Sequence, residues 1–354
     1  MALDLKIKKK LQGFALDCSF NASHEIIGIL GASGSGKSML LRSIAGLVKP
    51  DTGRIAMNGR TLFDSEGKID LSPKERRVGF LFQNFALFPH MTIFDNIGFG
   101  LGKMTRKDKS DKVMDLIGRF HLSGMENRYP AQISGGQQQR AALARALSVE
   151  PEILLLDEPF SALDEHLKIQ MMKEMSETLA GYPGTVLFVT HNMQEVYRLA
   201  NRIIVLNNGS MEAFGSKEDV FMHPPTLDTA RITGCKNLAA AHRLSDYKCY
   251  VPEWGAELSM ENAMALAKGY IGIRANHIRQ ATGSEPCNRF EAYIADHSEA
   301  PFRISLFLKI GGPPAGKEDY HIQWEISRDE WNRVCGMAQP LELYLDPKRV
   351  FFMP

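Results

Sequence analysis

Long hydrophobic runs are missing from this sequence. The longest apolar stretches, at residues 26–30 and 153–156, have only the length of a strand, whereas a helix that crosses a bilayer needs about 20 apolar residues. The first ten residues contain lysines with no apolar segment behind them, so we expect no signal peptide. The sequence therefore predicts a chain without a membrane span of its own.

Cysteine and net charge are also scarce. None of the five cysteines lies in a Cys-x-x-Cys pair, which argues against a structural zinc site or a disulfide framework. The 42 basic and 41 acidic side chains give a net charge of +1, so broad electrostatic binding of nucleic acid has no support. A chain of 354 residues with 44% hydrophobic residues predicts a globular protein of two domains.

Strand-like and helix-like patterns alternate over residues 1–232, the expected first domain. Short apolar runs typical of buried parallel strands lie at 26–30, 153–156 and 185–189, and helical spacing occurs at 38–47, 136–147 and 167–180. This alternation predicts an α/β fold with a parallel sheet. The pattern between about residues 88 and 151 is mostly helical, so we expect a helical subdomain there.

The pattern changes after about Thr233. Short alternating stretches such as 270–274 and 302–310 are separated by glycine and proline, including the Gly-Gly-Pro-Pro loop at 311–314. We therefore expect a β-rich second domain over residues 235–354, built as small barrels or a sandwich.

A complete G-x-x-x-x-G-K-[ST] loop lies between a predicted strand and a predicted helix. Its residues are Gly31, Ala32, Ser33, Gly34, Ser35, Gly36, Lys37 and Ser38. Glycines let the backbone N–H groups converge on phosphate oxygens, and the helix N-terminus adds a favourable dipole. Lys37 would neutralise β- and γ-phosphate charge, and the Ser38 hydroxyl would bind Mg²⁺. A chance Gly/Ser-rich turn is the alternative, but such a turn needs neither the strand nor the helix.

Two carboxylates, Asp157 and Glu158, follow the apolar run 153–156. Asp157 would hold the Mg²⁺ shell, and Glu158 would polarise a water for attack on the γ-phosphate. Alone, such a pair is more often a helix start or a solvated strand end. Together with the phosphate loop, it favours a nucleotide-hydrolysing site.

A second glycine-rich turn reads Ile133-Ser134-Gly135-Gly136-Gln137 and opens the helix expected at 136–147. Ser134 suits a helix N-cap, and the turn is also a potential phosphate cradle. Here the chain resembles ABC transporter ATPases, whose signature is Leu-Ser-Gly-Gly-Gln. The resemblance covers roughly residues 1–232 and implies a P-loop NTPase fold of the ABC cassette type. It also implies a homodimer in which the signature of each subunit closes over the ATP of the other.

The same resemblance implies roles for four more residues. Gln83 would sense Mg²⁺ and the attacking water, and His191 would contact the γ-phosphate. Asp164, which ends a Ser-Ala-Leu-Asp run, would lie in the loop that crosses the dimer seam. Phe14 would stack on adenine; neighbouring Phe20 is the alternative.

Residues 53–101 resemble the ATPases of molybdate and sulfate importers. This implies a peripheral ATPase on the cytoplasmic face of the cell membrane, which serves a separate permease and, indirectly, a solute-binding protein. The permease would dock near Phe85, Phe88 and Met91. The resemblance favours molybdate or a related oxyanion as the solute, with sulfate, iron, polyamine and sugar as alternatives.

Residues 270–278 are similar to a Gly-x-Arg-x-x-x-Ile stretch in the small β regulatory domains of such ATPases. The implied role is regulation through dimer contact or through oxyanion binding, and both stay open. Non-transport relatives fit less well. A DNA-repair ATPase would need a coiled-coil insertion or zinc modules, a translation-associated ATPase normally has two cassettes, and a small-molecule kinase would not need the signature turn.

Overall fold

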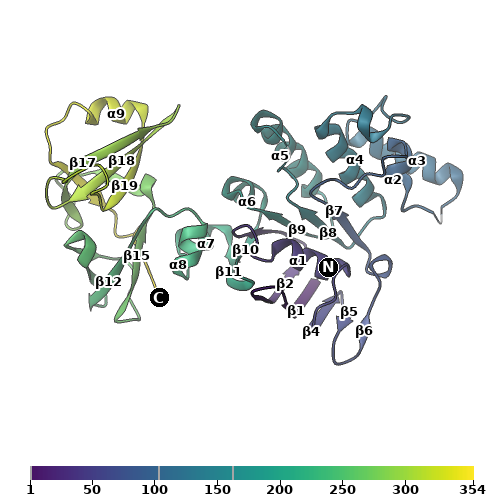
Figure 1. Ribbon diagram of the computed structural model, residues 1–354, viewed down its shortest axis with the longest axis horizontal. Helices are drawn as coiled ribbons and strands as arrows, with labels where there is room; N and C mark the ends of the chain where they lie inside the picture. Colours follow the sequence, from purple (N-terminus) through teal and green to yellow (C-terminus); the bar gives the residue numbers. More distant parts are fainter. Residues whose placement is uncertain (1, 103, 162) are drawn as a thin grey trace. The chain divides into compact units, whose positions relative to one another are not determined.

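The computed structural model describes residues 2–102, 104–161 and 163–354, and the chain forms two compact units, 1–217 and 218–354. Figure 1 traces the elements of both. The division falls before the expected boundary at residue 232. The reason is that helix α8 (Leu227–Ile232) packs Ala230 against Phe351 and Met353, and so belongs to the second unit.

The described part of the first unit forms one sheet of eleven strands in the order β6-β5-β4-β1-β2-β11-β10-β3-β9-β8-β7. The strands are β1 (Ala2–Lys10), β2 (Ala15–Ser23), β3 (Ile26–Leu30), β4 (Thr52–Met57), β5 (Arg60–Asp64), β6 (Ile69–Asp70), β7 (Val78–Leu81), β8 (Ile153–Asp157), β9 (Thr185–Thr190), β10 (Arg202–Asn207) and β11 (Ser210–Ser216). Neighbours from β10 to β7 pair in parallel, and β1, β2, β4, β5 and β6 form an antiparallel arm.

The helices of this unit are α1 (Lys37–Ala45), α2 (Ile93–Gly98), α3 (Arg106–Arg119), α4 (Gly135–Ser148), α5 (Glu165–Ala180) and α6 (Met193–Leu199). Helix α7 (Lys217–Met222) begins at the division between the units. Helices α2, α3 and α4 contact one another within the region expected to be helical (Figure 1). No helix in the described ranges is long and apolar enough to cross a membrane.

Four parallel strands direct their carboxyl ends to one edge of the sheet. Strands β3, β8 and β9 are buried along most or all of their length, because they consist of apolar residues covered on both faces. The segments that follow β3, β7, β8 and β9 therefore meet at this edge, where ligands of open α/β sheets usually bind. The phosphate loop follows β3, and the turn with Gln83 follows β7. Glu158 follows β8, and His191 follows β9.

The second unit is built from two antiparallel sheets, in agreement with the β-rich domain expected from the sequence. One has the order β14-β13-β12-β15-β21 and the other β16-β20-β17-β18-β19. The elements are β12 (Asn237–Ser245), β13 (Lys248–Val251), β14 (Ala256–Ser259), β15 (Lys268–Ile273), β16 (Ile278–Gln280), β17 (Arg289–Glu299), β18 (Arg303–Ile310), β19 (Ile322–Ser327), α9 (Arg328–Val334), β20 (Leu341–Leu345) and β21 (Phe351–Met353). Alternate residues of β18 are buried, so its apolar side chains enter a shared core.

Candidate functional site

The phosphate loop takes the backbone shape that its glycines predict. Gly34 and Gly36 have φ angles of 80° and 100°, values that residues with a side chain rarely adopt. Gly36 is also the N-cap of α1. A Cβ on Gly31 would lie 2.3 Å from the carbonyl oxygen of Leu206, so only glycine lets this backbone approach β10. The loop thus presents the N-terminus of α1 to the sheet edge.

Lys37 is buried, with 5% of its surface exposed. Its Nζ donates to the carbonyl oxygens of Gly31 at 2.9 Å and Ala32 at 2.8 Å. Burial lowers the pKa of the Lys37 ammonium, and the nearby Glu158 and Asp157 carboxylates partly oppose that shift. Neutral carbonyls do not cancel a buried positive charge, so this loop is suited to an anion.

Ser38 and Asp157 form the second polar contact of the site. The Ser38 hydroxyl donates to Asp157 Oδ1 at 2.7 Å. Burial raises the pKa of the Asp157 carboxyl, and the Ser38 hydrogen bond partly opposes this. A hydroxyl and a carboxylate side by side are hard oxygen ligands, and Mg²⁺ in phosphate sites commonly takes only one or two protein ligands besides phosphate and water. These residues therefore fit Mg²⁺.

Glu158 is held in a strained backbone conformation, with φ of 46°. Its N–H donates to Val189 O at 3.0 Å, and its own carbonyl accepts from the Ser161 hydroxyl at 3.0 Å. Strain of this kind is often retained where function needs it. It aims the Glu158 side chain toward the residues that follow the neighbouring strands.

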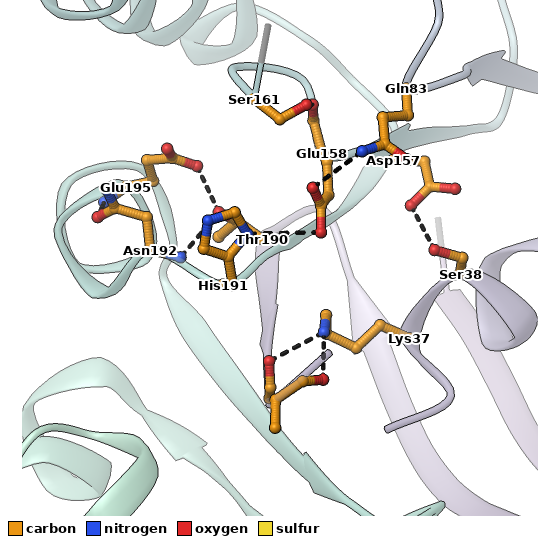
Figure 2. A network of polar contacts seen from close by, with 12 residues as sticks. Lys37, Ser38, Gln83, Asp157, Glu158, Ser161, Thr190, His191, Asn192 and Glu195 are labelled. Atoms are coloured by element: carbon orange, nitrogen blue, oxygen red, sulfur yellow. Dashed lines mark hydrogen bonds and ion pairs between the residues drawn. The ribbon is translucent and has the colours of Figure 1, made fainter. Parts of the chain in front are cut away.

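Gln83 and His191 converge on the Glu158 carboxylate. Gln83 Nε2 lies 3.2 Å from Glu158 Oε2, and His191 Nδ1 lies 3.5 Å from Glu158 Oε1. Figure 2 shows the three side chains meeting above Lys37 and Ser38. The structure therefore brings together Lys37, Ser38, Gln83, Asp157, Glu158 and His191, which the sequence placed in one site.

A cavity of about 680 Å³ covers the phosphate loop. It is lined by Leu11, Phe14, Ser33, Gly34, Ser35, Gly36, Lys37, Ser38, Met39, Gln83, Glu158 and His191. Phe14 is half-buried at its wall. Phe20 is 5% exposed and packs edge-to-face on Phe214, so Phe14 is the ring that a base in this cavity would meet.

One buried polar atom in the loop supports a phosphate ligand. The Ser35 hydroxyl is buried and has no hydrogen-bond partner among the described residues. Such groups are rarely left unpaired in folded proteins. A phosphate bound to the loop would supply the acceptor that Ser35 lacks.

The signature turn lies apart from this cavity. Ser134 caps α4 by accepting from the Gln137 N–H at 3.3 Å, and the Gln137 side chain accepts from the Ser134 N–H at 2.9 Å. Asp164 caps α5 by accepting from Leu167 N–H at 2.9 Å. Ala162, between Ser161 and Asp164, lies outside the described residues. The cavity described above is thus not lined by Ser134, Gly135, Gly136, Gln137 or Asp164.

Several residues around the site carry little or no sequence signal. Leu11 and Met39 line the cavity, but single apolar residues give no motif. Thr190 and Glu195 form a buried hydrogen bond beside His191 (Figure 2). The position of Thr190 next to His191 was the only available signal.

The prediction that the permease docks near Phe85 is wrong for this side chain. Phe85 is only 8% exposed, because it turns into the core of the first unit. The proposed permease surface therefore cannot present Phe85. Phe88 and Met91 are half-buried, so both retain accessible surface.

Comparisons with known proteins agree with this geometry. Residues 16–161 match the family described as "ABC transporter". The chain is 35% identical to a sulfate/thiosulfate import ATP-binding protein of Bacillus cereus, over 93% of this chain and 91% of the relative. It is 43% identical to one from Rhizobium meliloti, over 92% and 82%. A dimeric bacterial ABC transporter cassette, MJ0796, is similar with a TM-score of 0.52 and 31% identity, over 61% of this chain and 99% of that one.

Proposed function

Because this chain belongs to the ATP-binding subunits of ABC importers and is an ATPase, we propose that it powers the uptake of sulfate or thiosulfate through a separate permease. The substrate rests on the relatives, which are named for sulfate and thiosulfate import. Neither relative is named for molybdate, so the molybdate expectation has no support from these two relatives.

The convergence of Gln83 and His191 on Glu158 carries the catalytic part of the proposal. Glu158 acts as general base on the attacking water, since its carboxylate lies above the phosphate loop. Gln83 and His191, whose nitrogens lie 3.2 and 3.5 Å from that carboxylate, hold the water and the γ-phosphate in place. A strained, pre-positioned base needs little reorganisation during the reaction.

The phosphate loop performs the binding step. Its backbone N–H groups and Lys37 hold the β- and γ-phosphates, and Phe14 stacks on the adenine ring. Ser38, Asp157 and Gln83 would hold Mg²⁺. When bound, the ion supplies neutralisation of phosphate charge. The buried Ser35 hydroxyl gains an acceptor at the same time.

A second subunit completes the site. Ser134 to Gln137 and Asp164 do not line their own cavity, although the Ser134 turn opens a helix whose N-terminus suits phosphate. A related cassette has been solved as a dimer in a post-hydrolysis state with ADP and Pi bound. In the proposed homodimer, each signature turn meets the ATP held by the other subunit.

The remaining partners follow from the proposed transport function. The subunit lies on the cytoplasmic face of the membrane and contacts the permease with the half-buried Phe88 and Met91, and the permease receives solute from a binding protein outside. The second unit, which contributes none of the cavity-lining residues, regulates the ATPase through dimer contacts.

An uptake experiment tests the substrate. The chain is expressed in cells that keep the matching permease and binding protein but lack their own ATP-binding subunit. Labelled sulfate uptake should return and should fall when unlabelled thiosulfate is added, while molybdate should compete poorly. Restored uptake that molybdate, but not thiosulfate, suppresses would overturn the sulfate assignment.

A further inference from the structure

A largely buried ion pair joins helix α5 to helix α6, which follows the turn that contains His191. Lys168 Nζ lies 2.6 Å from Glu195 Oε1, with 14% and 4% of the side chains exposed. The other carboxylate oxygen, Glu195 Oε2, accepts from the Thr190 hydroxyl at 2.5 Å. Each Glu195 oxygen therefore binds a different element, and none of these three residues lines the nucleotide cavity.

Thr190 links this ion pair to His191. The Thr190 hydroxyl also accepts from the Asn192 N–H at 3.0 Å, so the residues on both sides of His191 are held. Asn192 in turn caps α6, which carries Glu195. Figure 2 shows Glu195, Thr190 and Asn192 close to His191, whose imidazole faces Glu158.

Lys168 links the same ion pair to the start of α5. Its backbone N–H donates to the carbonyl oxygen of Asp164 at 2.9 Å. The preceding residue, Leu167, lies beside the signature turn, because a Cβ on Gly136 would be 3.2 Å from Leu167 Cδ2. A continuous set of contacts thus runs from the signature turn through α5 to the His191 turn.

We infer that Lys168 and Glu195 are positioning residues for ATP hydrolysis: their ion pair fixes Thr190, and through it the imidazole of His191, relative to the start of α5. The inference rests on the proposed role of His191 in the site. A buried pair whose members satisfy each other holds a fixed geometry, because moving either charge away leaves the other uncompensated. A displacement of about 1 Å at a catalytic group can cost about 100-fold in rate.

The test uses the full chain with the paired substitution Lys168→Met plus Glu195→Gln, which removes both charges together. We expect kcat for ATP hydrolysis to fall about 10- to 100-fold, while KM for ATP changes less than about twofold, because neither residue touches the nucleotide cavity. The single variant Lys168→Arg, which keeps Glu195 and the positive charge, should retain most of the ATPase activity. The matched control is Arg140→Met plus Glu174→Gln, which removes another ion pair between α5 and a neighbouring helix, 3.3 Å long, and should leave kcat unchanged.

A second background separates positioning from simple structural damage. In a His191→Ala chain, measured by single-turnover hydrolysis, the paired substitution should cause little further loss, because the group that it positions is gone. An equal loss in both backgrounds would overturn the inference, as would an unchanged kcat or a parallel rise in KM. If the paired variant has a lower Tm than the Arg140/Glu174 control, the Lys168→Arg chain becomes the test. A kcat of the Lys168→Arg chain no higher than that of the paired variant would also overturn the inference. Failure of the proposed function would show earlier, as absent ATPase activity or an unaffected kcat in the His191→Ala parent.

Discussion

Arg145 of α4 holds the backbone of Ala86 in a strained turn. Arg145 Nη1 donates to Ala86 O at 2.7 Å and Nη2 donates to Phe85 O at 2.9 Å. Both receiving residues have positive φ, 60° at Phe85 and 47° at Ala86. The guanidinium carbon also lies 5.4 Å from the centre of the Phe88 ring. The helix that begins at the signature turn is thereby attached to the segment that follows Gln83.

Arg145→Met should destabilise the first unit. Burial lowers the pKa of this guanidinium, so its removal ends a desolvation cost. It also leaves the part-buried carbonyl of Phe85 without its donor, whereas water can replace the donor at the exposed Ala86 carbonyl. Leaving a buried carbonyl unsatisfied costs about 1–3 kcal/mol. Urea unfolding of the nucleotide-free subunit measures the change. Arg119→Met, at the exposed end of α3, is the control and should shift stability by no more than about 0.5 kcal/mol.

Glu158→Gln should bind ATP normally and hydrolyse it about 10²–10⁴-fold more slowly, the usual contribution of a general base. Glutamine keeps the size of the side chain and its contact to Gln83, but it cannot accept the proton of the water. The substituted chain should collect as an ATP-bound dimer, visible by size-exclusion chromatography. Glu152→Gln, just before the other end of β8, controls for loss of a carboxylate. Near-normal turnover by the Glu158→Gln chain would rule out the general-base role.

Asp157→Asn should stabilise the nucleotide-free subunit at neutral pH. Burial raises the pKa of Asp157 in the folded state, so its contribution to folding is complete below the unfolded pKa and is lost as pH rises through the raised folded pKa. Asparagine never ionises and avoids that loss. The stability difference between variant and parent should therefore grow from pH 4 to pH 7 in urea unfolding, while Mg²⁺-dependent ATPase activity disappears. A pH-independent difference would contradict the burial argument.

The sequence could predict which residues meet at the sheet edge because these residues directly follow apolar strands. Runs such as 153–156 and 185–189 are strands in the structure, and parallel pairing necessarily brings their carboxyl ends together. Buried partners could not be predicted in this way. Glu195 lies on a short helix with an ordinary polar sequence, and only the packing of α5 against α6 shows that it binds Lys168.

The burial of Phe85 in the docking segment and the position of the unit boundary are also set by packing, which the sequence does not show. Phe85 and Phe88 belong to one apolar run, yet Phe85 has a positive φ and is buried, whereas Phe88 keeps exposed surface. Helix α8 follows the first domain in sequence but packs on β21, whose residues are more than a hundred positions away. No local pattern contains that contact.

Phe88→Ala and Phe85→Ala should have different effects. The Phe88 ring packs at a tilt against Phe99, with 4.5 Å between ring centres, and keeps exposed surface. We expect Phe88→Ala, like Met91→Asp, to leave the ATPase of the free subunit largely intact while reducing co-purification with the permease. Phe85→Ala removes a buried ring and should destabilise the subunit by about 3–5 kcal/mol. Unimpaired permease binding by both Phe88→Ala and Met91→Asp would place the docking surface elsewhere.

Mixed dimers test whether the signature turn acts on the partner's nucleotide. Ser134→Arg places a bulky cation at the N-terminus of α4, and Lys37→Ala removes the buried ammonium of the phosphate loop; dimers with either change in both subunits should be inactive. A dimer with one subunit of each kind has one composite site with both changes and one with neither. That second site should bind ATP and restore part of the activity, up to about half if the sites fire independently. Ser134 does not line the cavity of its own subunit. If each site were confined to one subunit, only the Lys37→Ala substitution would damage a site. Ser134→Arg homodimers would then hydrolyse ATP normally, and that result would refute the shared site.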